Sequence, residues 1–196
     1  MRRREFTSHA ITLGALGFPG AALANALSQT DAASGVRAAL ERGAGAAVSL
    51  LGRNDGFLGN PKVKIALPGF LEDAAKLLRA TGQGRRVDEL VTAMNRAAEA
   101  AVPEARGLLV AAVKSMSVGD AVAIVRGGDN SVTGFFSDKT RTPLGVKFLP
   151  IVSRATERVA LARKYDALAG KAASLGLLKK EDANLNQYVT GKALDG

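Results

Sequence analysis

Three polar side chains whose types and spacing could do chemistry together, Asn95, Arg96 and Glu99, follow one another closely in the chain. Residues three and four apart lie side by side on a helix, so Glu99 can contact both Asn95 and Arg96 if this stretch is helical. Arg96 could then bind an anion while Glu99 orients its guanidinium group. The same pattern is typical of a polar helix face, or of a network that fixes how two helices pack, because structural ion pairs resemble sites. Burial separates these interpretations, since exposed side chains with no pocket beside them would exclude a site.

A second candidate is a basic stripe formed by Lys147, Arg154 and Arg158, which are spaced by seven and then four residues. This spacing places all three on one face of a helix. The stripe could bind acidic lipid headgroups at a membrane surface, or anionic cell-wall polymers. The alternative is an ordinary solvated helix face.

Several chemistries are excluded by composition. The chain contains no Cys, which excludes disulfides, thiol nucleophiles and thiolate metal sites, and its only His is His9. We find no serine-hydrolase, phosphate-loop or dinucleotide-binding motif. Catalysis would need carboxylates, Lys, Tyr or Ser, and none of these is arranged persuasively. Asp88, Glu89 and Glu99 could be imagined as a paired-carboxylate site, but they fit a helix surface equally well. The sequence therefore favours a protein that is not an enzyme, with a carboxylate-based hydrolase as the alternative, and predicts no cofactor and no metal.

The candidate site lies at the end of a helix predicted over residues 85–101. Its apolar face is formed by residues at helical spacing: Val87, Leu90, Val91, Met94, Ala97, Ala98 and Ala101. Asn95 falls on the flank of that face, while Arg96 and Glu99 point roughly away from it. Val102 and Pro103 must then interrupt the helix, because proline clashes with the preceding turn.

The remaining pattern is helical almost throughout. We expect a first helix from near Ser28 to Leu51 and further helices opening at Pro68, Pro103, Ser117, Asp129 or Asn130, Thr142 and Asp182. Ser117 and Asp120 have the spacing of a capping box, and Pro150 predicts a kink. Close helix packing would explain the glycines at 35, 43 and 45. The fold class is therefore all-α, a compact bundle of about seven to eight helices.

Residues 54–66 are the one clear break in this pattern. Turn signals at Asn54-Asp55-Gly56 and Gly59-Asn60-Pro61 surround an alternating stretch, Lys62-Val63-Lys64-Ile65. We expect either a short β-hairpin or an extended loop here. A calcium loop is excluded, because Leu51, Arg53 and Lys62 would fall at positions that need oxygen ligands.

Residues 1–26 have the features of an export signal. Three consecutive arginines at positions 2–4 precede an apolar stretch over residues 10–18, and Ala22-Leu23-Ala24 has the small-x-small pattern of a cleavage site. Arg3-Arg4-Glu5-Phe6 resembles the twin-arginine signature, but Thr7 departs from it, so the general secretory route stays open. We predict cleavage after Ala24 or Ala26, a periplasmic location, and a single helical domain over residues 27–196 with no transmembrane segment.

The net charge also bears on partners. The formal charge of +9 falls to +7 when three arginines and Glu5 leave with the signal. A basic surface attracts anionic partners, or it serves solubility alone. Nucleic acid is an unsuitable partner, because the chain has no recognition motif and only 5% aromatic residues for stacking.

Several stretches together resemble a bacterial family known only as DUF4197, a domain of unknown function. They are residues 55–65, Asn95-Arg96-Ala97-Ala98-Glu99, Phe148-Leu149-Pro150-Ile151, Tyr188-Val189-Thr190 and residues 192–196. The resemblance implies no activity and no catalytic residue. It implies a further acidic helix beyond the segment 193–196. Either the sequence is truncated here or this copy of the protein has lost that helix. The absence of the helix would expose an apolar groove. We therefore expect a non-catalytic envelope protein that binds a partner protein or an apolar or anionic ligand.

Overall fold

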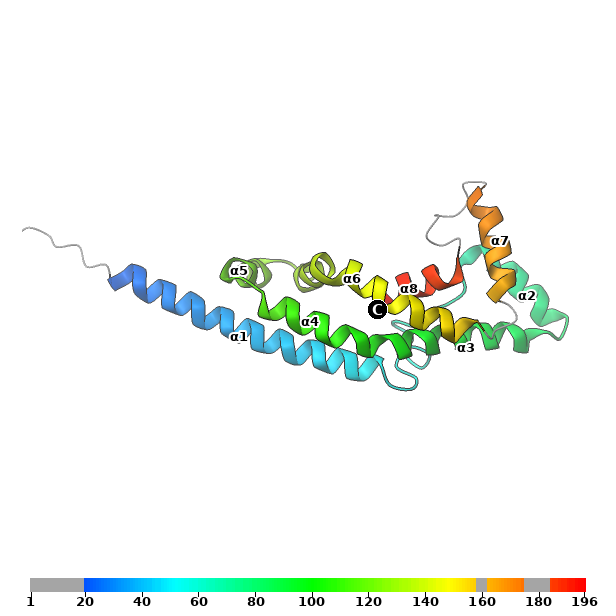
Figure 1. Cartoon of the computed structure of the whole chain (residues 1–196), viewed down its shortest axis with the longest axis horizontal. Coiled ribbons are helices and arrows are strands. Elements are labelled where there is room, and N and C mark those ends of the chain that lie inside the picture. The colour runs from blue at the N-terminus through cyan, green and yellow to red at the C-terminus, as the bar shows by residue number, and fades with distance from the viewer. Residues whose placement is uncertain (1–19, 158–161, 175–183) are drawn as a thin grey trace, which may run out of the picture.

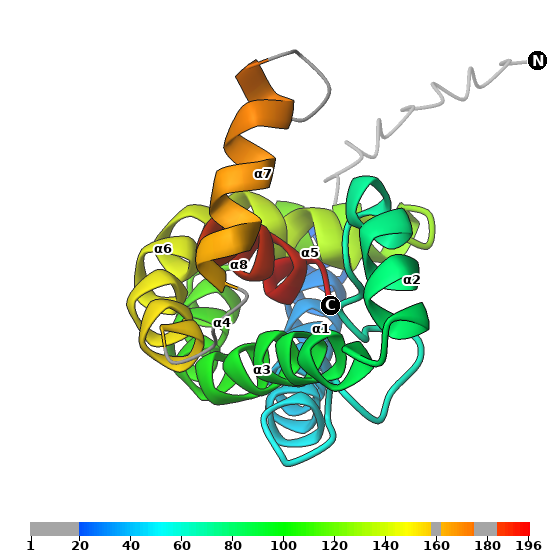
Figure 2. The same cartoon turned by 90° about the vertical axis from the view of Figure 1, so that its right-hand side faces the viewer.

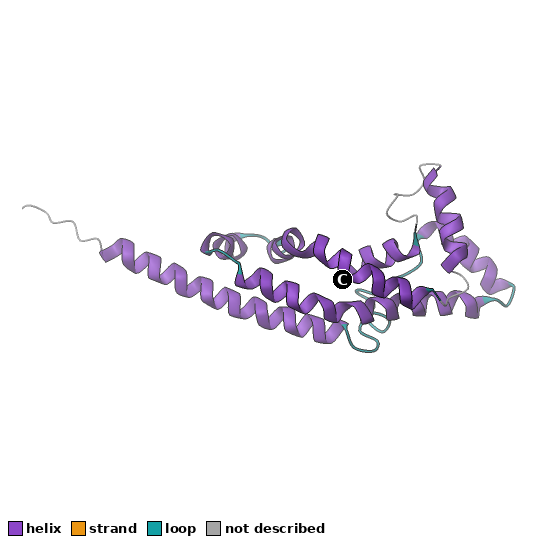
Figure 3. Cartoon of the chain, in the orientation of Figure 1, coloured by secondary structure: helices purple, strands orange, loops and turns teal. Residues whose placement is uncertain are grey.

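The structure is a computed structural model that describes residues 20–157, 162–174 and 184–196 (Figure 1). These residues form helices, turns and loops, and none of them is in a strand (Figure 3). The α-helices are α1 (Gly20–Leu51), α2 (Glu72–Ala80), α3 (Gly84–Ala101), α4 (Ala105–Lys114), α5 (Val118–Arg126), α6 (Ser131–Thr156), α7 (Ala162–Ser174) and α8 (Leu185–Asp195). The predicted all-α fold is confirmed.

The helices pack around α3 and α6. Helix α6 contacts α3, α4 and α8, while α1 packs along α4 and α5. The N-terminal part of α1 extends beyond the other helices in Figure 1. The main core contains Phe57, Met94, Phe148, Tyr165 and Val189, each 2% exposed or less. Because the aromatic and long apolar side chains of α3, α6, α7 and α8 meet here, this is where apolar burial stabilises the fold most.

A proline and a glycine mark two helix boundaries, and the break at Pro103 is the predicted one. Val102 and Pro103 lie in a short 3-10 turn, Val102–Glu104, which separates α3 from α4. Gly82 follows α2 with a φ of +76°, a left-handed conformation that glycine adopts without strain. The predicted capping box is also confirmed: the Ser117 hydroxyl accepts a hydrogen bond from the Asp120 N–H at 3.0 Å, and the Asp120 carboxylate accepts one from the Ser117 N–H at 2.9 Å.

Three local predictions are wrong. Helix α1 begins by Gly20, the first described residue, and not near Ser28, because the alanine-rich stretch that precedes Ser28 is itself strongly helix-forming. Residues 129–136 and 142–156 do not form separate helices: α6 runs through both Pro143 and Pro150 and changes direction along its length (Figures 1 and 2). A buried row at four-residue spacing crosses both prolines, so packing offsets their local cost of about 3 kcal/mol each. That row consists of Thr140, Leu144, Phe148, Val152 and Thr156.

The third wrong prediction concerns the glycines of α1. A Cβ atom placed at Gly35, Gly43 or Gly45 would meet no other element within 4 Å. Close packing against a neighbouring helix therefore does not explain them.

The predicted helix start at Asp182 lies outside the described residues, and α8 begins at Leu185 with the Asn184 side chain capping its first turn. Of the alternatives for residues 54–66, the described chain shows an extended loop with turns and no hairpin.

Among the described residues, no single helix is both long and apolar enough to cross a membrane. The segment Gly84–Lys114, which comprises α3, the 3-10 turn and α4, meets that test only together with α5 (Val118–Arg126). The two are bent by 104° at the break between them.

Candidate functional site

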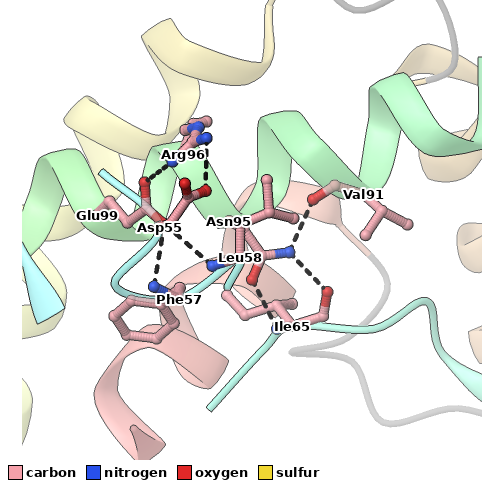
Figure 4. Close-up of polar contacts among 8 residues, drawn as sticks. All are labelled: Asp55, Phe57, Leu58, Ile65, Val91, Asn95, Arg96 and Glu99. Atoms are coloured by element: carbon pink, nitrogen blue, oxygen red, sulfur yellow. Dashed lines mark hydrogen bonds and ion pairs between the residues drawn. The ribbon is translucent and has the colours of Figure 1, made fainter. Parts of the chain in front are cut away.

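Asn95 and Glu99 point from α3 into the loop of residues 53–66, which we call the clamped loop (Figure 4). Asn95 is fully buried. Its Oδ1 accepts a hydrogen bond from the N–H of Ile65 at 2.8 Å, and its Nδ2 donates to the carbonyls of Ile65 at 2.9 Å and Val91 at 2.8 Å. The amide thus pairs with the backbone of Ile65 as a neighbouring strand would, and it satisfies both polar groups of that residue.

Glu99 holds the other end of the clamped loop. Its Oε1 accepts hydrogen bonds from the N–H groups of Phe57 and Leu58, both at 3.0 Å, and its Oε2 accepts one from Arg96 Nη1 at 2.6 Å. Arg96 Nη2 in turn lies 2.8 Å from Asp55 Oδ1. The three residues predicted as a site are therefore brought together, by hydrogen bonds and ion pairs within the chain.

Backbone geometry explains why the loop can approach α3 so closely. Asp55 has a φ of +63°, in the left-handed region that Asp and Asn tolerate best among residues with side chains. A Cβ atom on Gly56 would clash with the carbonyl oxygens of Leu50 and Leu51 at the end of α1. These two residues turn the chain tightly enough to place Phe57 in the core with 0% exposure.

The electrostatics of Glu99 follow from these contacts. Burial alone would raise the pKa of the Glu99 carboxyl, but the hydrogen bonds from Leu58, Arg96 and Phe57 outweigh it and hold this pKa below its ordinary value. The hydrogen bond with Glu99 raises the pKa of the Arg96 guanidinium. Glu99 is therefore an ionised, buried acceptor at neutral pH.

The basic stripe is not assembled in the same way. Lys147 Nζ lies 3.5 Å from Glu104 Oε2, and Arg154 Nε donates to the carbonyl of Pro150 in its own helix at 3.3 Å. Arg158 lies outside the described residues. Anion binding by this stripe stays a prediction.

The structure contains an apolar groove of about 580 Å³ between α1 and α6. The family resemblance implies an exposed apolar groove, but the sequence does not indicate which helices line it. Val102, Ala105 and Leu109 also line it, as do the last residues of α8. We call it the α1–α6 groove. Its volume falls within the range of about 300–1,000 Å³ typical of small-molecule sites.

The two walls of the α1–α6 groove differ in polarity. The α1 wall consists of small or apolar side chains at helical spacing: Ala39, Leu40, Gly43, Ala44, Ala47, Val48 and Leu51. The α6 wall has a more buried row and a more exposed row, each with four-residue spacing: Val132, Phe136, Thr140, Leu144 and Phe148, and then Thr133, Ser137 and Arg141. The Thr140 hydroxyl donates to the Phe136 carbonyl at 2.7 Å, so the more buried row presents mainly carbon to the groove.

No metal-binding group of three or more His, Cys, Asp or Glu side chains occurs in the part of the chain that the structure describes.

Comparison with known proteins identifies the family. No curated protein and no solved structure matches the chain. Residues 26–196 match the family described as protein of unknown function (DUF4197), as the stretches quoted from the sequence indicate. Because this match covers most of the chain, the protein belongs to the DUF4197 family.

Proposed function

We propose that the protein is an exported, non-catalytic binding protein of the bacterial envelope, and that the α1–α6 groove holds an apolar small-molecule ligand. The observation that carries this proposal is the groove itself, about 580 Å³ in volume and lined mainly by carbon. Burying such a surface away from water is favourable, by roughly 25 cal/mol per Å² of apolar area. A small ligand fits better than a protein partner, because a volume of about 580 Å³ lies within the range typical of small-molecule sites.

Export is the second part of the proposal. It is supported by the arginines at positions 2–4, the apolar stretch over residues 10–18 and the Ala22-Leu23-Ala24 pattern. The family match begins at residue 26, next to the predicted cleavage site. N-terminal sequencing of protein recovered from the periplasm should give a chain that starts at Asn25 or Leu27. Recovery of the intact N-terminus from the cytoplasm would refute export.

The alternative, a carboxylate-based hydrolase, receives no support from the geometry of Glu99. Both oxygens of this carboxylate accept hydrogen bonds from within the chain, and the side chain is 5% exposed. A general base must reach a proton of the substrate or of a water molecule. Glu99 has the surroundings of a structural acceptor.

Gly43 allows a direct test of the groove. This residue lines the α1–α6 groove, and a Cβ atom there meets nothing within 4 Å, so Gly43→Leu adds a side chain at the groove with no clash at its Cβ. Gly45→Leu is the matched control, because Gly45 has the same open space on the same helix but does not line the groove. Both changes favour the helix by up to about 1 kcal/mol.

The measurement is a fluorescence titration of the full chain with the neutral apolar dye Nile red. We expect Gly43→Leu to weaken binding by about tenfold or more, the usual effect of steric exclusion from an apolar pocket. Gly45→Leu should bind as the unmodified protein does. Equal affinity of all three proteins would refute the groove as the binding site.

A further inference from the structure

The α1–α6 groove has one cation and one anion among its lining residues, and they contact each other. Arg141 Nη2 lies 2.8 Å from Asp195 Oδ1, where α6 meets the end of α8. Both side chains are about half exposed, at 47% and 50%. Exposed pairs of this kind contribute only about 0–1 kcal/mol, so another anion can replace Asp195 beside Arg141 at small cost.

Asp195 also has a second cation at hand. Lys192 Nζ lies 3.9 Å from its other carboxylate oxygen, Oδ2. If Arg141 turns toward a bound anion, Asp195 keeps Lys192 as a partner and is not left without a counter-charge. Arg141 is thus the groove cation that can change partners.

The more exposed polar residues of the α6 wall form a row that ends at Arg141. Thr133, Ser137 and Arg141 follow one another at four-residue spacing on the more exposed row of α6. The more buried row beside it, and the α1 wall opposite, are apolar apart from the Thr140 hydroxyl, which is bonded to its own helix. A ligand that matches this arrangement has a long apolar part and one anionic end.

We infer that the α1–α6 groove binds a single-chain amphiphile with a carboxylate head, a fatty acid, and that Arg141 binds the head while the chain lies between α1 and α6. This inference rests on the proposed function and names its ligand class. Arginine suits a carboxylate because its planar fork donates two parallel hydrogen bonds. A groove of about 580 Å³ suits one hydrocarbon chain better than the two chains of a membrane phospholipid.

The test is displacement of Nile red from the full chain by dodecanoate, by the neutral analogue dodecanol and by dodecyl phosphate, each below its micelle concentration. Dodecanoate should displace the dye at about tenfold lower concentration than dodecanol, the effect of one charge-assisted hydrogen bond. Arg141→Gln should remove this difference and leave dodecanol unchanged. Asp195→Asn should strengthen dodecanoate binding, because the competing carboxylate is gone.

Lys139→Gln is the matched control, since Lys139 lies on the same helix, carries the same charge and does not line the groove. It should preserve the preference for dodecanoate. Equal displacement by dodecanoate and dodecanol, unchanged in Arg141→Gln, would overturn the fatty-acid inference while the Gly43→Leu result still supports the groove. Tighter binding of dodecyl phosphate than of dodecanoate would overturn the choice of a carboxylate head. Nile red binding that ignores Gly43→Leu would overturn both proposals.

Discussion

Replacing Glu99 with glutamine changes one atom of the side chain that holds the clamped loop: a carboxylate oxygen becomes an NH₂ group. The side-chain oxygen of the variant can still accept the two N–H bonds from Phe57 and Leu58, but an NH₂ group then faces the Arg96 guanidinium, which has only donors. The opposite orientation of the amide sets its NH₂ against the two backbone N–H groups instead. Either way, a charge-assisted bond of about 1.5–3 kcal/mol is lost and a donor stays unsatisfied, so we expect Glu99→Gln to lower the free energy of unfolding by about 2–4 kcal/mol.

The pH dependence of this loss has a defined sign. The folded-state pKa of the Glu99 carboxyl lies below its ordinary value of 4.5. The stability that the ionised carboxylate contributes is therefore complete above pH 4.5, and it is lost as the pH falls through the lower, folded-state pKa. The difference between the unmodified protein and Glu99→Gln should consequently shrink on acidification.

The assay is urea unfolding followed by circular dichroism at neutral pH and at several values below pH 4.5. Asp55→Asn is the matched control: it removes the other, 58% exposed partner of Arg96, and asparagine tolerates the φ of +63° at this position. It should cost no more than about 1 kcal/mol. Equal stability of Glu99→Gln and the unmodified protein at neutral pH, or a difference that stays constant on acidification, would refute the role assigned to Glu99.

Three further substitutions test other parts of the fold by the same unfolding assay. Asn95→Asp should cost about 3–5 kcal/mol, because it places a buried negative oxygen against the carbonyl of Ile65; a loss below 1 kcal/mol would contradict the pairing. Ser117→Ala should lower the free energy of unfolding by about 1 kcal/mol. It should also raise the pKa of Asp120 in an NMR titration, because hydrogen bonds from the Ser117 N–H and hydroxyl hold that pKa below its ordinary value. An unchanged pKa would contradict the capping box. Phe57→Ala should cost about 3–5 kcal/mol, since Phe57 is fully buried, and a near-neutral result would show that the loop does not contribute to the core.

Local signals in the sequence predict some of the helix ends. The capping box at Ser117 and Asp120 and the stop at Gly82 depend only on residues within one turn, so the sequence carries all the information that they need. The path of α6 is different. Its two prolines favour helix ends locally, and only the packing of the buried row that includes Leu144 and Phe148 keeps the helix intact.

The candidate site could be predicted only in part for a related reason. Helical spacing brings Asn95, Arg96 and Glu99 to one side of α3, but their partners in the clamped loop include backbone groups of Phe57, Leu58 and Ile65. Backbone groups are the same in every residue, so no side-chain pattern marks them. The alternation of Lys62-Val63-Lys64-Ile65 similarly fits a strand or an extended loop, because the partner that decides between them lies 30 residues away at Asn95.

The clamped loop also implies an asymmetry in how the protein tolerates mutation. Asn95 and Glu99 bind the loop through hydrogen bonds to its peptide groups. A substitution of the side chain at Leu58 leaves these groups in place. A random library over the loop and α3 should therefore retain many side chains at Leu58 and very few at Asn95 or Glu99. Asp55 and Gly56 set the turn within the loop, whereas two residues of α3 determine where the loop lies.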